Sequence, residues 1–160
     1  MRRAFSLLAV GIALIALHGC SDPSPLNVDG GYVRLNANPA APSAGYFTIH
    51  GGPAPVVLRD ITTNAAVRVE MHESKMQDGM ATMAPIDTVD VPAGGTIKFE
   101  PGGKHVMLWQ VNQQAIAAGK MTFTFLFSNG DRILVDAVIQ KPDGAAPAAD
   151  NAAAETHAGH

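Results

Sequence analysis

Polar and apolar residues alternate with a period of two through much of this 160-residue chain, which is the pattern of half-buried β-strands. Successive side chains of a strand point to opposite sides of a sheet, so one side can face a core while the other faces water. The clearest stretches are residues 32–36, 46–50, 67–72, 96–100, 121–127 and 133–139. Shorter strands are expected at residues 56–59, 88–91 and 105–109.

Turns rich in glycine and proline separate these stretches and complete the prediction of the fold. The chain has 16 Gly and 11 Pro, which cluster at residues 51–53, 92–95 and 101–103. The sequence Asn-Gly-Asp at residues 129–131 lies between two strong strands and predicts a hairpin. We find no amphipathic helical spacing in the core region. We therefore expect an all-β domain, an antiparallel β-sandwich or small barrel, at residues 30–141.

The N-terminus is typical of an exported bacterial lipoprotein. Two arginines precede an apolar run at residues 5–17, which is too short to span a bilayer comfortably and suits a signal peptide. The sequence Leu-His-Gly-Cys at residues 17–20 resembles a lipobox, although ordinary signal cleavage nearby is an alternative. We expect a signal peptide at residues 1–19, lipidation of Cys20 and a polar tether at residues 20–29. The protein would then be periplasmic and anchored to a membrane.

The remaining composition limits the partners and reactions to consider. Without the signal peptide the chain has 9 basic residues, the 11 of the whole chain less its first two arginines, against 14 acidic ones, and no basic patch. A nucleic-acid partner is therefore not expected. Cys20 is the one cysteine, so the mature domain has no thiol for a disulfide, a nucleophile or a metal ligand. Residues 142–160 lack large apolar residues and are expected to form a disordered tail.

Three donor side chains fall on strand positions that face away from the predicted core. His72 belongs to the polar positions of its strand, two residues after Glu70. His105 and Met107 are two residues apart on a predicted strand, so they project to one side about 7 Å apart along the chain. Trp109 falls on that side too and is a candidate to shield a site or pack at its edge. Two donors that project together suit the coordination of one ion.

A group of methionines adds soft donors to this set. Met76, Met80 and Met83 lie in the polar segment 73–85, which we expect to be a loop. Methionine normally fills cores, so three in a polar segment indicate another role. Thioether sulfur suits Cu(I), with imidazole as a compatible partner, and has little use for Zn²⁺ or Mg²⁺. Neutral ligands leave only the single charge of Cu(I), which is easier to desolvate than a divalent charge.

The spacing of these donors resembles that of the periplasmic PCu(A)C copper chaperones. Their pattern is His, ten residues, Met, twenty-one residues, His, one residue, Met, and it matches His72, Met83, His105 and Met107. Residues 91–96 and 101–108 also resemble the most recognisable segments of that family. The resemblance spans about residues 44–139. It implies a cupredoxin-like β-sandwich that binds Cu(I) near its surface through these four residues and passes it to the copper centre of a respiratory cytochrome oxidase.

The resemblance leaves open the roles of several neighbouring residues. Met80 and Met76 are candidate auxiliary ligands, and Trp109 stands where smaller apolar residues are more usual in the family. Some family members carry C-terminal extensions with metal ligands, so His157 and His160 are candidates for a secondary Cu(II) site. His50 is expected to be an ordinary surface residue.

The predicted function is that of a monomeric copper metallochaperone and not of an enzyme. Its partner would be a copper-accepting protein, such as a cytochrome oxidase subunit or a thiol-containing copper chaperone. Four protein ligands would close the coordination sphere, whereas catalytic metal sites keep a position open. Two alternatives stay open. One is a copper-storage or buffering protein, and the other is a metal-free, lipid-anchored β-sandwich used in adhesion or assembly.

Overall fold

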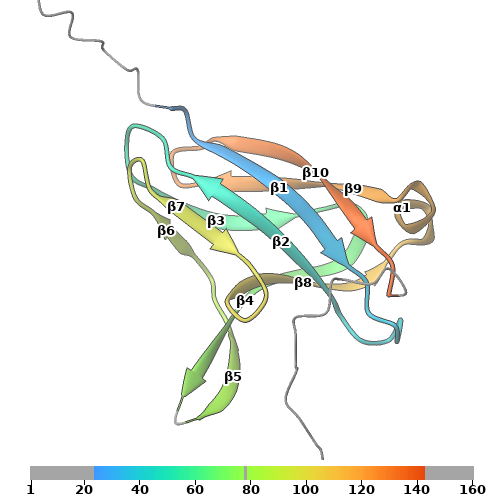
Figure 1. Cartoon of the computed structure of the whole chain (residues 1–160). Coiled ribbons are helices and arrows are strands. Elements are labelled where there is room, and N and C mark those ends of the chain that lie inside the picture. Colours follow the sequence, from blue (N-terminus) through green and yellow to red (C-terminus); the bar gives the residue numbers. More distant parts are fainter. Residues whose placement is uncertain (1–23, 78, 143–160) are drawn as a thin grey trace, which may run out of the picture.

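A computed structural model describes residues 24–77 and 79–142 (Figure 1). In chain order the elements are β1 (Asn27–Arg34), β2 (Ser43–His50), β3 (Val56–Thr62), β4 (Ala66–Gln77), β5 (Met80–Pro85), β6 (Val89–Val91), β7 (Thr96–Phe99), β8 (Lys104–Val111), α1 (Gln113–Ala118), β9 (Lys120–Phe127) and β10 (Arg132–Gln140). The predicted signal peptide, Cys20 and the tail histidines His157 and His160 lie outside the described residues. In the part of the chain that the structure describes, no helix is long and apolar enough to cross a membrane.

The strands form one continuous hydrogen-bonded sheet in the order β5-β4-β8-β7-β2-β1-β10-β9-β3-β6. β8, which carries His105 and Met107, pairs with β4 along one edge and with the start of β2 along the other. Most neighbouring strands are antiparallel, as expected. The exceptions are β1 with β10 and the short contact of β7 with β8, which are parallel. β1 and β10 are the first and last strands, so no short turn has to join them.

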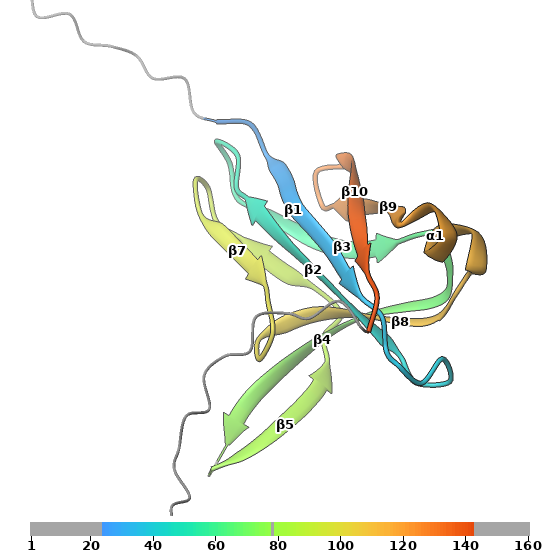
Figure 2. The same cartoon turned by 45° about the vertical axis from the view of Figure 1, so that its right-hand side comes forward.

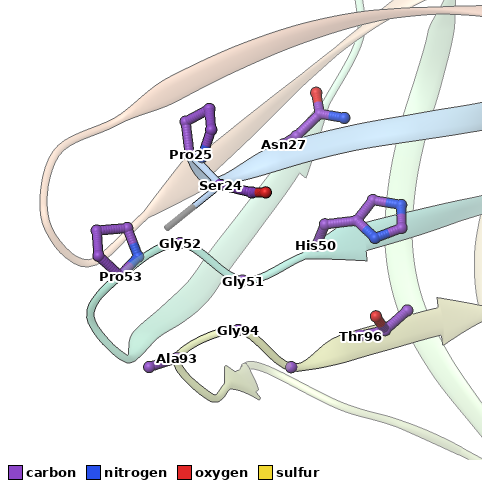
Figure 3. A pocket seen from close by; sticks show the side chains of 11 residues that line it. Ser24, Pro25, Asn27, His50, Gly51, Gly52, Pro53, Ala93, Gly94 and Thr96 are labelled. Carbon is purple, nitrogen blue, oxygen red and sulfur yellow. The ribbon is translucent and has the colours of Figure 1, made fainter. Parts of the chain in front are cut away.

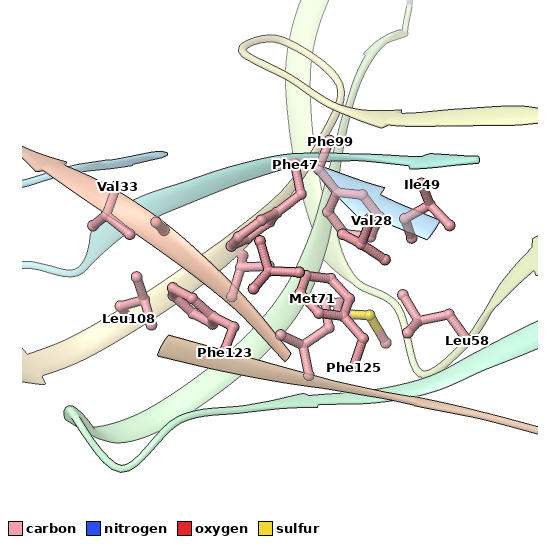
Figure 4. Close-up of a cluster of buried hydrophobic side chains, with 14 of the residues drawn as sticks. Val28, Val33, Phe47, Ile49, Leu58, Met71, Phe99, Leu108, Phe123 and Phe125 are labelled. Carbon is pink, nitrogen blue, oxygen red and sulfur yellow. The ribbon is translucent and has the colours of Figure 1, made fainter. Parts of the chain in front are cut away.

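The sheet folds over itself around a core of apolar side chains, which confirms the predicted β-sandwich (Figure 4). The ring of Phe47 on β2 meets those of Phe123 and Phe125 on β9 edge-on, with ring centroids 4.8 and 4.9 Å apart. Because β2 and β9 are not neighbours in the sheet, these contacts join two layers across the core. Val106 and Leu108 of β8 are fully buried in the same core.

Each alternating stretch overlaps a strand, and the predictions for residues 96–100, 121–127 and 133–139 agree with the observed ends to within one residue. β1 and β2 begin before the predicted starts at residues 32 and 46, and β4 continues beyond the predicted end at residue 72. The predicted hairpin joins β9 to β10. Its turn is closed by Asn129, whose side-chain oxygen accepts a hydrogen bond from the backbone N–H of Asp131. Gly130 there has a φ of 90°, which favours glycine. Alternation predicts these strands well because each has one side in the core.

Two local expectations were wrong because the deciding signal was weak. The helix α1 follows β8, and its six residues are too few to show an apolar period. Its ends do carry signals, since Asn112 accepts a hydrogen bond from the N–H of Ala115 and Gly119 ends the helix in the left-handed conformation. At the N-terminus, β1 begins at Asn27, inside the segment expected to be a tether, because Val28 is buried in the core.

The methionine-rich segment is a β-hairpin and not the expected loop. β4 continues past His72 to Gln77, and β5 returns alongside it from Met80. All six residues of β5 are exposed, so no buried side marks it as a strand in the sequence. The hairpin projects from the body of the domain at one edge of the sheet (Figure 1, Figure 2).

At the other end of β4, Val67 is exposed although its alternation placed it on the core side.

Candidate metal centre

The register of β5, β4 and β8 brings the predicted donors to one face of the sheet. Directly opposed residues of two strands share a face, and so do residues two apart on one strand. We call the side of these strands that faces away from Val106 and Leu108 the donor face. The opposed pairs that lie on it are His72–His105, Glu70–Met107, Arg68–Trp109 and Ser74–Met83. The candidate ligands, which are 35 residues apart at most in sequence, thus share a face.

His105 lies against the hairpin with both ring nitrogens engaged. Its Nδ1 is 3.0 Å from the carbonyl oxygen of Gly103, which can only accept a hydrogen bond, so Nδ1 donates and carries the proton. Its Nε2 therefore presents a lone pair to the sulfur of Met83, 3.2 Å away. His105 is only 8% exposed, less than expected for an outward-facing residue, because the Met83 side chain lies against its ring.

His72 lies directly across from His105, with the two ring centroids 6.1 Å apart. Its Nε2 is 3.0 Å from a carboxylate oxygen of Glu70, and since an ionised carboxylate only accepts, Nε2 donates. Its Nδ1 is buried and has no hydrogen-bond partner among the described residues. A buried polar atom without a partner is costly, which makes this nitrogen available as a ligand.

A charged and aromatic support lies beside His72. Arg68 donates from Nε to Glu70 at 2.7 Å, and its guanidinium carbon lies 4.5 Å from the ring centroid of Trp109. The hydrogen bond from His72, followed by that from Arg68, lowers the pKa of Glu70 below its ordinary value and favours the ionised acceptor. The sequence placed Arg68 and Glu70 on the same side as His72, but the use of Glu70 to orient the ring was missed. The spacing of two residues between Glu70 and His72 on one strand was the signal from which this contact could have been predicted.

Met107 and Met83 lie on either side of the histidine pair. Met107 follows His105 by two residues on β8 and is partly exposed, opposite Glu70. Met83 comes from β5 and is 55% exposed. The donors therefore range from a buried imidazole to a thioether that solvent can reach.

The same register separates the two remaining methionines of the hairpin. Met76 lies opposite Ala81 and shares the donor face with Met83. Met80 lies opposite Gln77, on the reverse face of the hairpin. Of the two candidate auxiliary ligands, only Met76 is therefore on the side of the histidine rings.

The chemistry of this donor set fits a soft monovalent ion. With metal–ligand bonds of about 2.0 Å to nitrogen and 2.3 Å to sulfur, as for zinc, two ligands of one tetrahedral ion lie about 3.5 Å apart. The distance of 3.2 Å between His105 Nε2 and Met83 Sδ is close to this value. Within residues 24–77 and 79–142, no three His, Cys, Asp or Glu side chains form a metal-binding group. The donors that do come together are imidazoles and neutral thioethers, which suit Cu(I).

A separate hollow of about 600 Å³ lies where β2 ends and β7 begins (Figure 3). His50 lines it and is a partly exposed residue that pairs with Asp29 at 3.2 Å, in keeping with the expected surface role. The two turns around the hollow are held together through their backbones, where Gly51 donates to the carbonyl of Gly95 at 2.7 Å.

Comparison with known proteins identifies the family. The family described as "Putative lipoprotein LpqE-like" matches residues 26–139. The chain belongs to this LpqE-like family. A curated relative from Leifsonia xyli subsp. xyli, "Putative lipoprotein Lxx21020", is 30% identical over 95 residues. That match covers 59% of the chain and 57% of the relative, so the chain spans little more than half of the relative's length.

Solved structures with the same fold include PCuAC domains. The chain matches the copper-bound PCuAC domain from PmoF2 with a TM-score of 0.59 and 16% identity, over 75% of the chain and 96% of that domain. It matches CuI-DR1885 from Deinococcus radiodurans with a TM-score of 0.59 and 23% identity, over 80% and 87% of the two chains. At these identities the likeness concerns the fold. It confirms the all-β fold that the resemblance to PCu(A)C proteins predicted.

Proposed function

We propose that this chain is an exported copper metallochaperone that binds one Cu(I) ion on its donor face and delivers it to a copper centre of a respiratory cytochrome oxidase. The proposed ligands are His72, Met83, His105 and Met107. The observation that carries this proposal is the state of the two histidine rings. Each has one nitrogen held by an acceptor and the other left as a lone pair, which in His105 faces the Met83 sulfur and in His72 is buried without a partner among the described residues.

The hydrogen bonds support Nδ1 of His72 and Nε2 of His105 as the proposed ligand atoms. Metal-binding imidazoles almost always donate their other N–H to a carboxylate or a backbone carbonyl, which here are Glu70 and Gly103. A nitrogen lone pair that faces a sulfur lone pair at 3.2 Å has no hydrogen between the atoms to make the contact favourable. A cation that accepts both lone pairs removes that repulsion.

Copper as the cargo is also supported by the structures that share the fold, since the PmoF2 domain is copper-bound and DR1885 is recorded with CuI. The exposure of Met83 supports delivery over permanent storage. Neutral ligands at the surface would let the thiolates of an acceptor displace the protein's donors one at a time. A fully buried ion would exchange more slowly.

The proposed location is the periplasm, with a lipid anchor at Cys20. The family and the Leifsonia relative are described as lipoproteins, which supports the lipobox reading of the N-terminus. An anchor would keep the carrier near membrane-bound acceptors. A secondary Cu(II) site at His157 and His160 also stays a proposal. A Cu(II) titration of the chain with and without residues 142–160 tests it.

An anaerobic Cu(I) titration of the mature chain against a competing chelator tests the site. We expect one tight equivalent, which weakens in Met83→Ala and in Met107→Ala. Met80→Ala is the matched control, because Met80 belongs to the same hairpin but lies on its reverse face. Equal affinities for all three variants and the wild type would contradict the named ligands.

A transfer assay separates delivery from buffering. Cu(I)-loaded protein is mixed with the purified soluble copper domain of an oxidase subunit, and the rate of copper transfer is followed. A rate that increases with acceptor concentration indicates direct delivery. A rate fixed at that of spontaneous release would instead indicate storage or buffering.

A further inference from the structure

The donor face continues outward beyond the proposed ligands. The exposed fraction rises from 8% at His105 to 55% at Met83 and 72% at Met76. Because Met76 lies opposite Ala81 and Met83 opposite Ser74, the two methionines are diagonal neighbours on one face of the hairpin. Such neighbours have β-carbons about 7 Å apart, within reach of two long side chains. Methionine is flexible enough for both sulfurs to meet on one ion.

The position of Met76 is explained neither by packing in the core nor by a place among the four proposed copper ligands. With most of its surface exposed it contributes little to a core. The proposed site already has four donors, and the sulfur that contacts His105 belongs to Met83. Met76 is not one of the four proposed ligands, but it lies on the same face as Met83, the most exposed ligand named above. Its thioether therefore stands where an ion would enter or leave the site.

We propose that Met76 is a transfer ligand, which binds Cu(I) only while the ion passes between the donor face and an acceptor with thiolate groups. This inference rests on the proposed function. Sδ of Met76 forms a bond to the ion as Nε2 of His105 releases it, while Met83 stays bound. An acceptor thiolate then displaces Met76 in the same way, and further donor groups of the acceptor replace the remaining protein ligands one at a time. Each step forms one ligand bond and breaks one, and copper remains Cu(I), so no oxidant or reductant takes part.

A ligand that binds only in transit has a distinctive effect. It lowers the barrier for loading and for release equally, so it changes both rates and leaves the equilibrium affinity unaltered. A resident ligand would change the affinity instead. The chain supplies its own control, since Met80 is similarly exposed, at 68%, and belongs to the same hairpin but lies on the reverse face.

Stopped-flow measurement of Cu(I) exchange with the chromophoric chelator bathocuproine disulfonate tests the proposal on the full mature chain. Met76→Leu keeps an apolar side chain of similar size but removes the sulfur. We expect it to slow both release and uptake by about fivefold while the affinity stays within about twofold of the wild type. Met76→Ala should behave like Met76→Leu, and Met80→Leu should exchange copper at the wild-type rate.

Three results would overturn the transfer role. Wild-type rates in Met76→Leu would show that the sulfur is not used. Slow exchange in Met76→Ala alone would assign the residue to apolar docking of the acceptor. A loss of affinity in Met76→Leu would make Met76 a resident ligand. By contrast, a wild-type chain that binds no Cu(I) in the equilibrium titration would overturn the proposed function itself, so the two failures are distinguishable.

Discussion

Glu70 provides the sharpest test of the proposed centre, because it should control Cu(I) binding without being a ligand. Its carboxylate accepts a hydrogen bond from Nε2 of His72, which leaves Nδ1 as the ring nitrogen without a partner among the described residues. Residues that orient metal-binding histidines typically change metal affinity by about 10- to 100-fold when they are removed. The Glu70 side chain is 31% exposed, so water replaces part of the lost hydrogen bond. We therefore expect Glu70→Ala to weaken Cu(I) binding by about tenfold.

The assay combines a chelator competition titration with nitrogen NMR of the histidine rings, which the diamagnetic Cu(I) ion permits. In the wild type, copper should shift Nδ1 of His72 and Nε2 of His105. Glu70→Gln keeps an oxygen that accepts from Nε2, so it should bind more tightly than Glu70→Ala. Glu73→Ala is the matched control, because Glu73 pairs with Lys104 at 2.7 Å and Lys75 at 2.8 Å and not with a histidine.

The reasoning would be refuted if Glu70→Ala bound Cu(I) as tightly as Glu73→Ala. It would also be refuted if copper shifted Nε2 of His72 in the wild type, since that atom is the one held by Glu70. Either result would mean that the hydrogen bond does not select the ligand nitrogen.

Three further predictions concern Trp109 beside the proposed site, the ion pairs of Glu73 and the buried Phe123. Trp109 is the one tryptophan and its ring lies 6.3 Å from that of His72, so Cu(I) should quench its fluorescence with an end point at one equivalent; unchanged emission would contradict the site. Hydrogen bonds from Lys104 and then Lys75 lower the pKa of Glu73 from its usual 4.5. That stabilisation is present above pH 4.5 and is lost as the pH falls through the lowered value, so Glu73→Gln should lose less thermal stability on acidification than the wild type. Phe123→Ala should lower the free energy of unfolding by about 3–5 kcal/mol in urea titrations, because Phe123 is fully buried; a much smaller loss would contradict its place in the core.

The sequence alone was sufficient for most strands and for the side on which several donors project. Burial of one side of a strand leaves a mark in every second residue, so Val106 and Leu108 identified the core side of β8 and left His105 and Met107 on the other. The same reasoning failed for β5, which has no buried side, and for α1, which is shorter than two turns. Local patterns report burial, so elements without a buried side are difficult to see.

The chain's residue order by itself determined the all-β class, the donor types and the spacing that resembles copper chaperones. Only the tertiary structure decided which donors meet. Pairing of β4 with β8 sets His72 opposite His105, although 32 residues separate them in the sequence. Pairing of β4 with β5 puts Met76 beside Met83 and Met80 on the reverse face, a distinction that the sequence left open. The physical reason is that strand register is a long-range property, set by how the whole sheet closes over its core, and a shift of one residue reverses the face of every side chain.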